Sequence, residues 1–133
     1  ERVAACRDAV GLTPQADQRV GVFSGGMKRR ANLATAIVHA PRLLFLDEPT
    51  VGVDAQSRAL IMDLLTGLKR DGTAMVYTTH TMEEAEALCD TVAIMDAGRI
   101  IVEGAPAHLI ADHPEAGSLG DLFLLLTGRT LRD

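Results

Sequence analysis

Three short stretches of the chain carry residue types that could do chemistry. "VFSGGMK" at residues 22 to 28 sets two glycines behind a serine, "LDEP" at residues 46 to 49 holds two adjacent acids, and "TTH" ends at His80. Glycine near a helix start is unfavourable by up to roughly 1 kcal/mol relative to alanine. We therefore expect a purpose for bare backbone in the first stretch, and charge chemistry in the other two.

The hydropathy pattern predicts helices that alternate with strands, and so an α/β fold. The strands at 42–47 and 72–80 are continuous apolar runs, typical of strands buried on both faces of a mostly parallel sheet. The turn "AGR" predicts an antiparallel hairpin at one end. The predicted helices cover residues 1–10, 24–39, 55–70, 81–89, 107–113 and 121–133, and the predicted strands cover 42–47, 72–80, 91–96 and 100–104.

The glycine pair favours an anion site on local grounds. With Ser24 as the N-cap, Gly25 and Gly26 become the first helical residues, and their N–H groups face outward without side chains over them. The helix dipole adds partial positive charge there, and an anion would offset the cost of the cations at 28–30. The alternative is a plain serine cap with a solvated basic face, and "SGG" alone favours that alternative.

The acid pair changes this balance. Parallel sheets bind ligands at the carboxyl ends of their strands, where Asp47 and Glu48 are expected. Two adjacent acids there suit magnesium with a nucleotide, one carboxylate serving the metal and the other positioning or deprotonating water. The alternative is that "DEPT" only opens a turn and caps the next helix.

His80 and Asp54 lie near this predicted edge. His80 ends the next strand, so its imidazole is expected beside the acids, in reach of a terminal phosphate or the attacking water. A lone histidine is more often a structural hydrogen-bonder, but this position favours a function. The local sequence predicts that Asp54 is the N-cap of the helix that begins at residue 55.

Composition restricts the classes of protein. The 133 residues are 47% hydrophobic and carry a formal net charge of −5, which disfavours a nucleic-acid surface spread over the whole domain. Cys6 and Cys89 form no CxxC pair, which favours core thiols in a reducing cytosol over a metal site or disulfide. No apolar run reaches membrane-spanning length, and no secretion signal is visible. Because Glu1 lies inside a predicted helix, we expect the sequence to begin within a longer protein.

In this order, the motifs resemble those of the ATP-binding cassette (ABC) family of transport ATPases. "FSGGM" is similar to the family's signature loop, "LLFLDEP" to its Walker B strand, "VGVD" to its D-loop, and "TTH" to its switch histidine. "SGGMKRR", "THTMEEAEALCD" and "DLFLLLTGR" resemble the drug-exporter (ABC-2 type) subgroup. The resemblance implies a partial P-loop NTPase-type (RecA-like) fold, with the signature-helix part of the helical subdomain.

The resemblance also implies nucleotide contacts. Ser24, Gly25 and Gly26 would bind the γ-phosphate of an ATP molecule held mainly by an opposing subunit, and Met27 would belong to the same nucleotide-binding loop. Gly25 and Gly26 would then leave the helix N-terminus uncovered, so that a phosphate of the nucleotide held by the opposing subunit could approach it. Phe23 departs from the commonest signature, as does Met27.

Catalytic roles follow from the same resemblance. Asp47 would bind Mg²⁺ directly or through water, Glu48 would be the general base, His80 would sense the γ-phosphate, and Asp54 would act across the dimer interface. Residues 1–112 would form the C-terminal part of a nucleotide-binding domain. Within it, 1–40 would be the helical or signature subdomain and 41–112 half of the catalytic core, followed by a linker and C-terminal helix at 113–133.

One family motif is absent from this sequence. A P-loop needs GxxxxGK[ST], but the only lysines are Lys28 and Lys69, preceded by Met27 and Leu68. We therefore expect residues 1–133 alone to be an inactive fragment of an ATPase.

The expected partners of the complete protein are a membrane-spanning permease and a second ABC ATPase subunit, as a homodimer, with no nucleic acid. Its expected place is peripheral, on the cytoplasmic face of the cell membrane, and export is the favoured direction. Two alternatives stay open: a cassette ATPase without a permease, as in DNA repair or translation, and a non-catalytic interaction module. The absence of sustained heptads disfavours the DNA-repair class, whose members carry long coiled coils.

Overall fold

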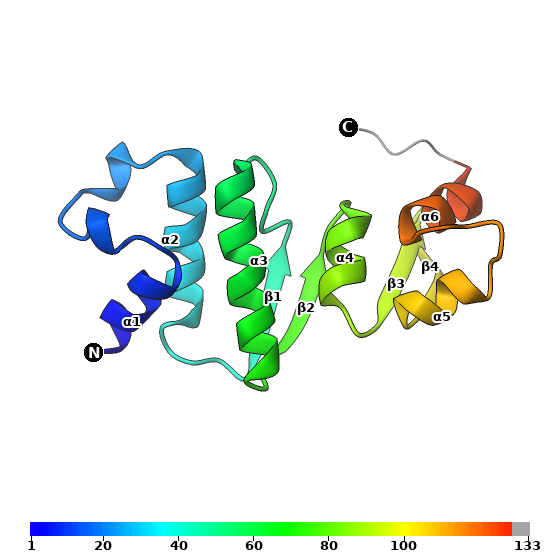
Figure 1. Cartoon of the computed structure of the whole chain (residues 1–133), viewed down its shortest axis with the longest axis horizontal. Helices are drawn as coiled ribbons and strands as arrows, with labels where there is room; N and C mark the ends of the chain where they lie inside the picture. The colour runs from blue at the N-terminus through cyan, green and yellow to red at the C-terminus, as the bar shows by residue number, and fades with distance from the viewer. Residues whose placement is uncertain (129–133) are drawn as a thin grey trace. The chain divides into compact units, whose positions relative to one another are not determined.

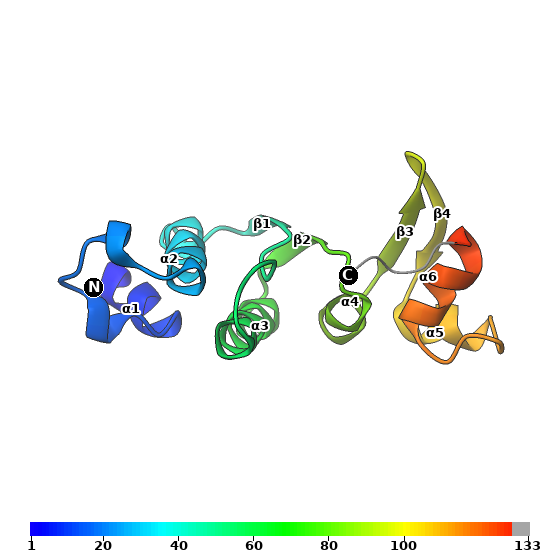
Figure 2. The same cartoon turned by 90° about the horizontal axis from the view of Figure 1, so that it is seen from above.

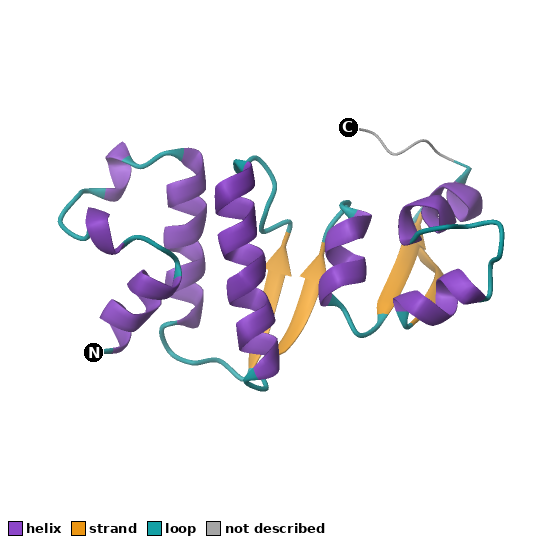
Figure 3. Ribbon diagram, viewed as in Figure 1, coloured by secondary structure: helices purple, strands orange, loops and turns teal. Residues whose placement is uncertain are grey.

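The computed structural model describes residues 1–128 and divides into two compact units, one of residues 1–78 and one beginning at Thr79. The first unit holds α1 (Arg2–Ala9), two 3-10 turns (Thr13–Gln15 and Val20–Val22), α2 (Gly25–Ile37), β1 (Leu43–Asp47), α3 (Ala55–Arg70) and β2 (Ala74–Thr78). The second holds α4 (Met82–Leu88), β3 (Val92–Asp96), β4 (Arg99–Gly104), α5 (Pro106–Ala111) and α6 (Leu119–Thr127) (Figures 1 and 3). The alternating helices and strands confirm the predicted α/β class.

In the first unit, β1 and β2 pair in parallel and α3 crosses over between them. The register runs from Leu43 opposite Ala74 to Asp47 opposite Thr78. Figures 1 and 2 show α3 along one face of this pair, and the Tyr77 hydroxyl lies 3.9 Å from the Met62 sulfur. A parallel connection through a helix is what the sequence pattern predicts.

The prediction that β1 and β2 are buried on both faces is wrong. Leu44 and Leu46 are buried, whereas Leu43 is 50% exposed, Phe45 72% and Val76 46%. Successive side chains of a strand point to opposite faces, so one helix layer covers only every second residue. The continuous apolar run therefore overstated the burial of this pair within the described chain.

Helix α2 packs on two sides. Met27, Ala31 and Ala34 contact a small core cluster formed by residues 10, 12 and 23. The other stripe, with Gly26, Leu33 and Ile37, is also buried. The apolar stripe predicted for residues 1–10 is buried only at Val10, which follows α1 and is 2% exposed, whereas Val3 within α1 is 68% exposed.

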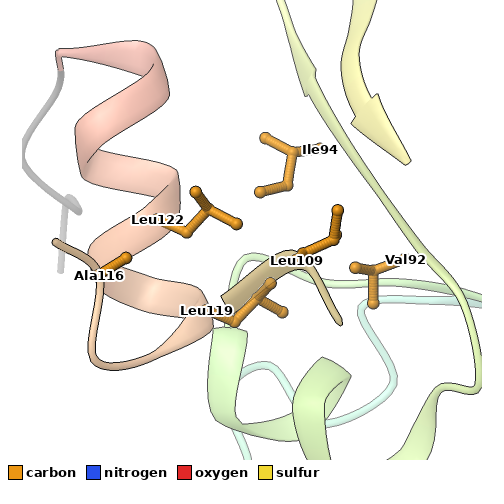
Figure 4. Close-up of a cluster of buried hydrophobic side chains, with 6 residues drawn as sticks. All are labelled: Val92, Ile94, Leu109, Ala116, Leu119 and Leu122. Carbon is orange, nitrogen blue, oxygen red and sulfur yellow. The ribbon is translucent and has the colours of Figure 1, made fainter. Parts of the chain in front are cut away.

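The second unit is built on the β3–β4 hairpin, which confirms the predicted antiparallel turn. Ala97 and Gly98 occupy its two central positions with φ of 47° and 76°, the left-handed region that tight two-residue turns require. Helices α5 and α6 bury one core with β3 (Figure 4). Its buried residues are Val92, Ile94, Leu109, Ala116, Leu119 and Leu122.

The predicted mostly parallel sheet needs a correction. Among residues 1–128, the strands form two separate two-stranded sheets, β1–β2 and β3–β4, of which only the first is parallel. Hydropathy identified each strand but carried no information on which strands pair. Cys6 and Cys89 are both free thiols, and no helix in the described part is long and apolar enough to cross a membrane. The predicted terminal helix forms as α6, and its residues 129–133 lie outside the described residues.

Candidate functional site

The acid pair lies where the two parallel strands of the first unit end. Asp47 is the last residue of β1, and its Oδ1 accepts a hydrogen bond from the hydroxyl of Thr78, its register partner at the end of β2. The N–H of Glu48 donates to the Thr78 carbonyl over 3.0 Å. Both acids are thus tied to the carboxyl edge of the pair, the edge at which parallel sheets bind ligands.

The backbone turns sharply after Asp47. Glu48 has φ of +47°, a left-handed conformation that is uncommon for a residue with a side chain. Thr50 is 2% exposed, and the Val51 N–H donates to the Glu48 carbonyl over 3.3 Å. The "DEPT" stretch therefore does open a turn, as its structural alternative supposed.

That stretch does not cap the next helix. The N-cap of α3 is Asp54, whose Oδ1 accepts from the Ser57 N–H over 2.8 Å. This confirms the local prediction for Asp54. Hydrogen bonds from the Ser57 N–H and then the Ser57 hydroxyl hold the pKa of the Asp54 carboxyl below its ordinary value.

The two glycines at the start of α2 have different surroundings. A Cβ added to Gly25 would meet nothing within 4 Å, whereas a Cβ on Gly26 would lie 2.6 Å from the Ser57 Oγ and 2.8 Å from the Asp54 Oδ2. Packing against the start of α3 therefore accounts for Gly26. The open backbone that the sequence suggested for both residues is found at Gly25.

The helix start itself is capped as predicted. The Ser24 Oγ accepts a hydrogen bond from the Met27 N–H over 3.2 Å. Gly25 and Gly26 are the first two residues of the helix, and their N–H groups therefore have no intrahelical partner. Met27 turns inward, and its side chain packs against the core cluster of residues 10, 12 and 23. Ser24 and Gly25 are thus the exposed part of the helix start.

Two of the basic residues after the glycines bind backbone carbonyls. The Arg29 guanidinium donates from Nε to the Pro49 carbonyl over 2.9 Å and from Nη2 to the carbonyls of Asp47, at 3.0 Å, and Glu48. Arg30 Nη1 donates to the carbonyls of Val10 and Gly11, the two residues that follow α1. These acceptors replace the anion that the sequence suggested as the partner of the basic stretch.

Arg29 and Thr78 are the two site residues that the sequence analysis missed. Arg29 follows Gly26 by three residues and precedes Leu33 by four, so it shares the buried stripe of α2. A charged residue on a buried stripe is a signal that it has a specific polar partner. Thr78 stands beside Asp47 only because of the register, which the sequence does not state.

His80 belongs to the second unit, and in the sequence it follows Thr78, the last residue of β2 and of the first unit, by two residues. It lies between Thr79 and Thr81, and the Thr81 N–H donates to the Thr79 Oγ1 over 2.9 Å. The Thr79 hydroxyl also donates to the Oε2 of Glu84 over 3.4 Å, and Glu84 is 5% exposed. The loop that presents His80 is therefore held by its own neighbours, and its placement beside the acids stays a prediction.

The acid pair fits a magnesium ion bound together with a phosphate ligand. Within residues 1–128 there is no group of three or more His, Cys, Asp or Glu side chains that could hold a metal ion by themselves. Mg²⁺ usually takes one or two carboxylates and completes its shell with water and phosphate oxygens. Asp47, exposed at the end of β1, provides such a carboxylate.

The chain is similar to known proteins over most of its length. The family model described as ABC transporter matches residues 1–51. The linearmycin resistance ATP-binding protein LnrL of Bacillus subtilis is 46% identical over 82% of the chain and 35% of its own length. The Nod factor export ATP-binding protein I of Rhizobium sp. is 49% identical over 77% of the chain and 34% of its own length. The chain thus spans about a third of these relatives.

Solved structures agree with these relatives. The structure of an ATP-binding subunit of an ABC transporter matches with a TM-score of 0.82 and 26% identity, covering 95% of this chain and 53% of that one. CbiO1 of Clostridium perfringens, part of the ABC transporter complex CbiONQ, matches with a TM-score of 0.72 and 33% identity, covering 84% of this chain and 45% of its own. With the ordered motifs and the parallel strand edge that carries the acids, these matches lead to one conclusion: the chain belongs to the ABC transporter family of ATP-binding domains.

Proposed function

We propose that the complete protein binds and hydrolyses ATP as the nucleotide-binding subunit of an ABC exporter. The observation that carries this proposal is the acid pair: Asp47 ends β1 in contact with Thr78 of the parallel partner, and Glu48 follows it. Magnesium bound with ATP supplies positive charge against the phosphates. The names of the two relatives, one for resistance and one for export, support the outward direction.

Asp47 and Glu48 have different proposed roles, one in binding the metal and the other in proton transfer. Asp47 holds the metal directly or through water, and Glu48 accepts the proton of the attacking water as general base. His80 contacts the terminal phosphate. The Thr78 hydroxyl, by donating to Asp47, fixes the orientation of that carboxylate.

The start of α2 receives a phosphate from a second subunit. The exposed Ser24 hydroxyl and the N–H groups of Gly25 and Gly26 are the donors, assisted by the helix dipole. Met27 supports them indirectly, since its N–H is already used by Ser24. Asp54, beside Gly26, carries the contact across the dimer, and the partners are a like subunit and a membrane permease on the cytoplasmic face of the cell membrane.

The decisive experiment purifies the complete protein and measures MgATP hydrolysis together with co-purification of a membrane subunit. Hydrolysis with a permease attached supports the transporter. Hydrolysis without one favours a cassette ATPase that works on its own, and binding to a permease without any hydrolysis favours the non-catalytic module.

The phosphate site has its own test. In a hydrolysis-blocked Glu48→Gln background, Gly25→Asp should abolish ATP-dependent dimers in sedimentation, because a carboxylate would repel the phosphate. Gly21→Asp is the matched control, since a Cβ at Gly21 also meets nothing within 4 Å. Persistence of the dimer in Gly25→Asp would refute the site.

The isolated chain provides a further test. Residues 1–133 lack a P-loop lysine, on which positioning of the terminal phosphates depends, and we propose that they neither hydrolyse ATP nor bind it tightly. Calorimetric titration with MgATP measures this directly. Low-micromolar binding would reveal a nucleotide site in this chain that its motifs do not account for.

A further inference from the structure

Arg29 makes an unusual set of contacts in the first unit. A single guanidinium in the second turn of α2 donates to the carbonyls of three consecutive residues, Asp47, Glu48 and Pro49. The side chain is only partly exposed, and two of the bonds are part-buried. The acceptors are the backbone of the turn that carries both proposed catalytic acids.

This turn needs support from outside itself. Glu48 adopts a left-handed backbone conformation, with φ of +47°, which persists in a residue with a side chain only where the surroundings hold it. Its N–H is held by the Thr78 carbonyl, and its own carbonyl by Arg29. The peptide groups on both sides of the Glu48 Cα are thereby fixed, and with them the direction in which its carboxylate leaves the chain.

We infer that Arg29 is a positioning residue, which holds the Glu48 carboxylate in its catalytic orientation and ties it to the helix that begins with Ser24 and Gly25. This inference rests on the proposed ATPase function and deepens it. Arg29 follows Gly25 by four residues, about one helical turn. Through Arg29, the helix start that is proposed to bind a phosphate is therefore connected to the turn that carries the proposed base.

The chemistry of the side chain explains why arginine stands here. The guanidinium is planar and carries five donors in a fixed fork, so it can bind several carbonyls at once. A lysine ammonium at the same place is a point charge with a flexible stem. The Arg29→Lys variant should therefore keep the charge but lose the geometry.

The test uses the complete protein with Arg29→Ala and Arg29→Lys, and with Arg42→Ala as the matched control, because Arg42 is an exposed arginine of the same unit. We expect Arg29→Ala to lower kcat roughly 10-fold or more, with the KM for ATP changed less than about 2-fold, since displacing a base affects the chemical step. Arg29→Lys should lie between Arg29→Ala and wild type. Arg42→Ala should match wild type.

A double-substitution cycle separates positioning from loss of stability. In a Glu48→Gln background, Arg29→Ala should reduce the residual turnover less than about 2-fold, because an absent base cannot be misplaced. Equal losses in both backgrounds would overturn the inference. So would an unchanged kcat in Arg29→Ala, if the wild type hydrolyses ATP.

Hydrogen exchange without nucleotide gives a readout independent of activity. The amides of Glu48 and Val51, which donate to the Thr78 and Glu48 carbonyls, should exchange faster in Arg29→Ala and stay unchanged in Arg42→Ala. Unchanged exchange at both amides would overturn the connection. If the wild type itself fails to hydrolyse ATP, the proposed function falls, and exchange alone decides whether Arg29 holds the turn.

Discussion

The two sheets of this chain are stabilised in different ways. The parallel β1–β2 pair has one apolar face largely exposed, and polar contacts from Thr78 and Arg29 hold its carboxyl edge. The β3–β4 hairpin closes through a local turn and packs on its own helices around a shared core. Polar groups thus concentrate where chemistry is proposed, while apolar burial maintains the second unit. Substitutions in the two regions should therefore separate activity from stability.

The largest effect is expected for Glu48→Gln in the complete protein. ATP turnover should fall roughly 10²-fold or more with ATP binding retained, because the general base is lost while the size and shape of the side chain change little. Steady-state hydrolysis and nucleotide titration measure the two quantities. The matched control is Glu103→Gln, an exposed acid on the hairpin strand β4, which should hydrolyse ATP as the wild type does. Near-normal turnover in Glu48→Gln would disprove its role.

The reverse result is expected in the hairpin unit. Leu122 lies on α6 and is 0% exposed in the core of the second unit. Leu122→Ala should therefore lower the free energy of unfolding by about 2 to 5 kcal/mol, because apolar burial is lost and a cavity is left. Leu125→Ala on the same helix removes the same atoms from a side chain that is 49% exposed, and should change stability by less than about 0.5 kcal/mol. Urea unfolding of both variants checks this. Equal losses of stability in the two variants would mean that α6 packs against the core through a different face.

The two neighbouring glycines give a smaller contrast within the first unit. Gly26→Ala should destabilise the fold by about 1 to 3 kcal/mol, because its Cβ would press on Asp54 and Ser57. Gly25→Ala, with open space around it, should shift stability by less than about 0.5 kcal/mol. Thermal unfolding of the two variants measures the difference. A tolerated Gly26→Ala would contradict the close packing of α2 against α3.

The smallest effect concerns the cap of α3. Because the folded state lowers the pKa of Asp54, the folded chain binds fewer protons than the unfolded chain, so this stabilisation is complete above the unfolded pKa of about 4. It is lost as the pH falls through the lowered folded pKa. The difference in Tm between wild type and Asp54→Asn should therefore be constant from pH 7 to 5 and change below about pH 4. A constant difference down to pH 3 would contradict the assigned cause.

The helices and strands were largely predictable because their signals are local. Ser24 and Asp54 cap α2 and α3 where the sequence places them, and Gly98 marks the hairpin turn. Burial was less predictable: Phe45 lies in a continuous apolar run yet is 72% exposed. Hydropathy reports what a side chain prefers, whereas exposure depends on which layers cover it.

The family and its candidate residues followed from the sequence alone, because ordered motifs such as "FSGGM" and "LLFLDEP" are contiguous in the chain. The partners of those residues did not. Thr78 meets Asp47 through strand register, Gly26 meets Ser57 through helix packing, and Arg29 reaches the carbonyls after β1 across 18 to 20 positions of sequence. These contacts arise only when distant segments pack, since caps and turns are set by neighbours in sequence and contacts between elements are set by the tertiary fold.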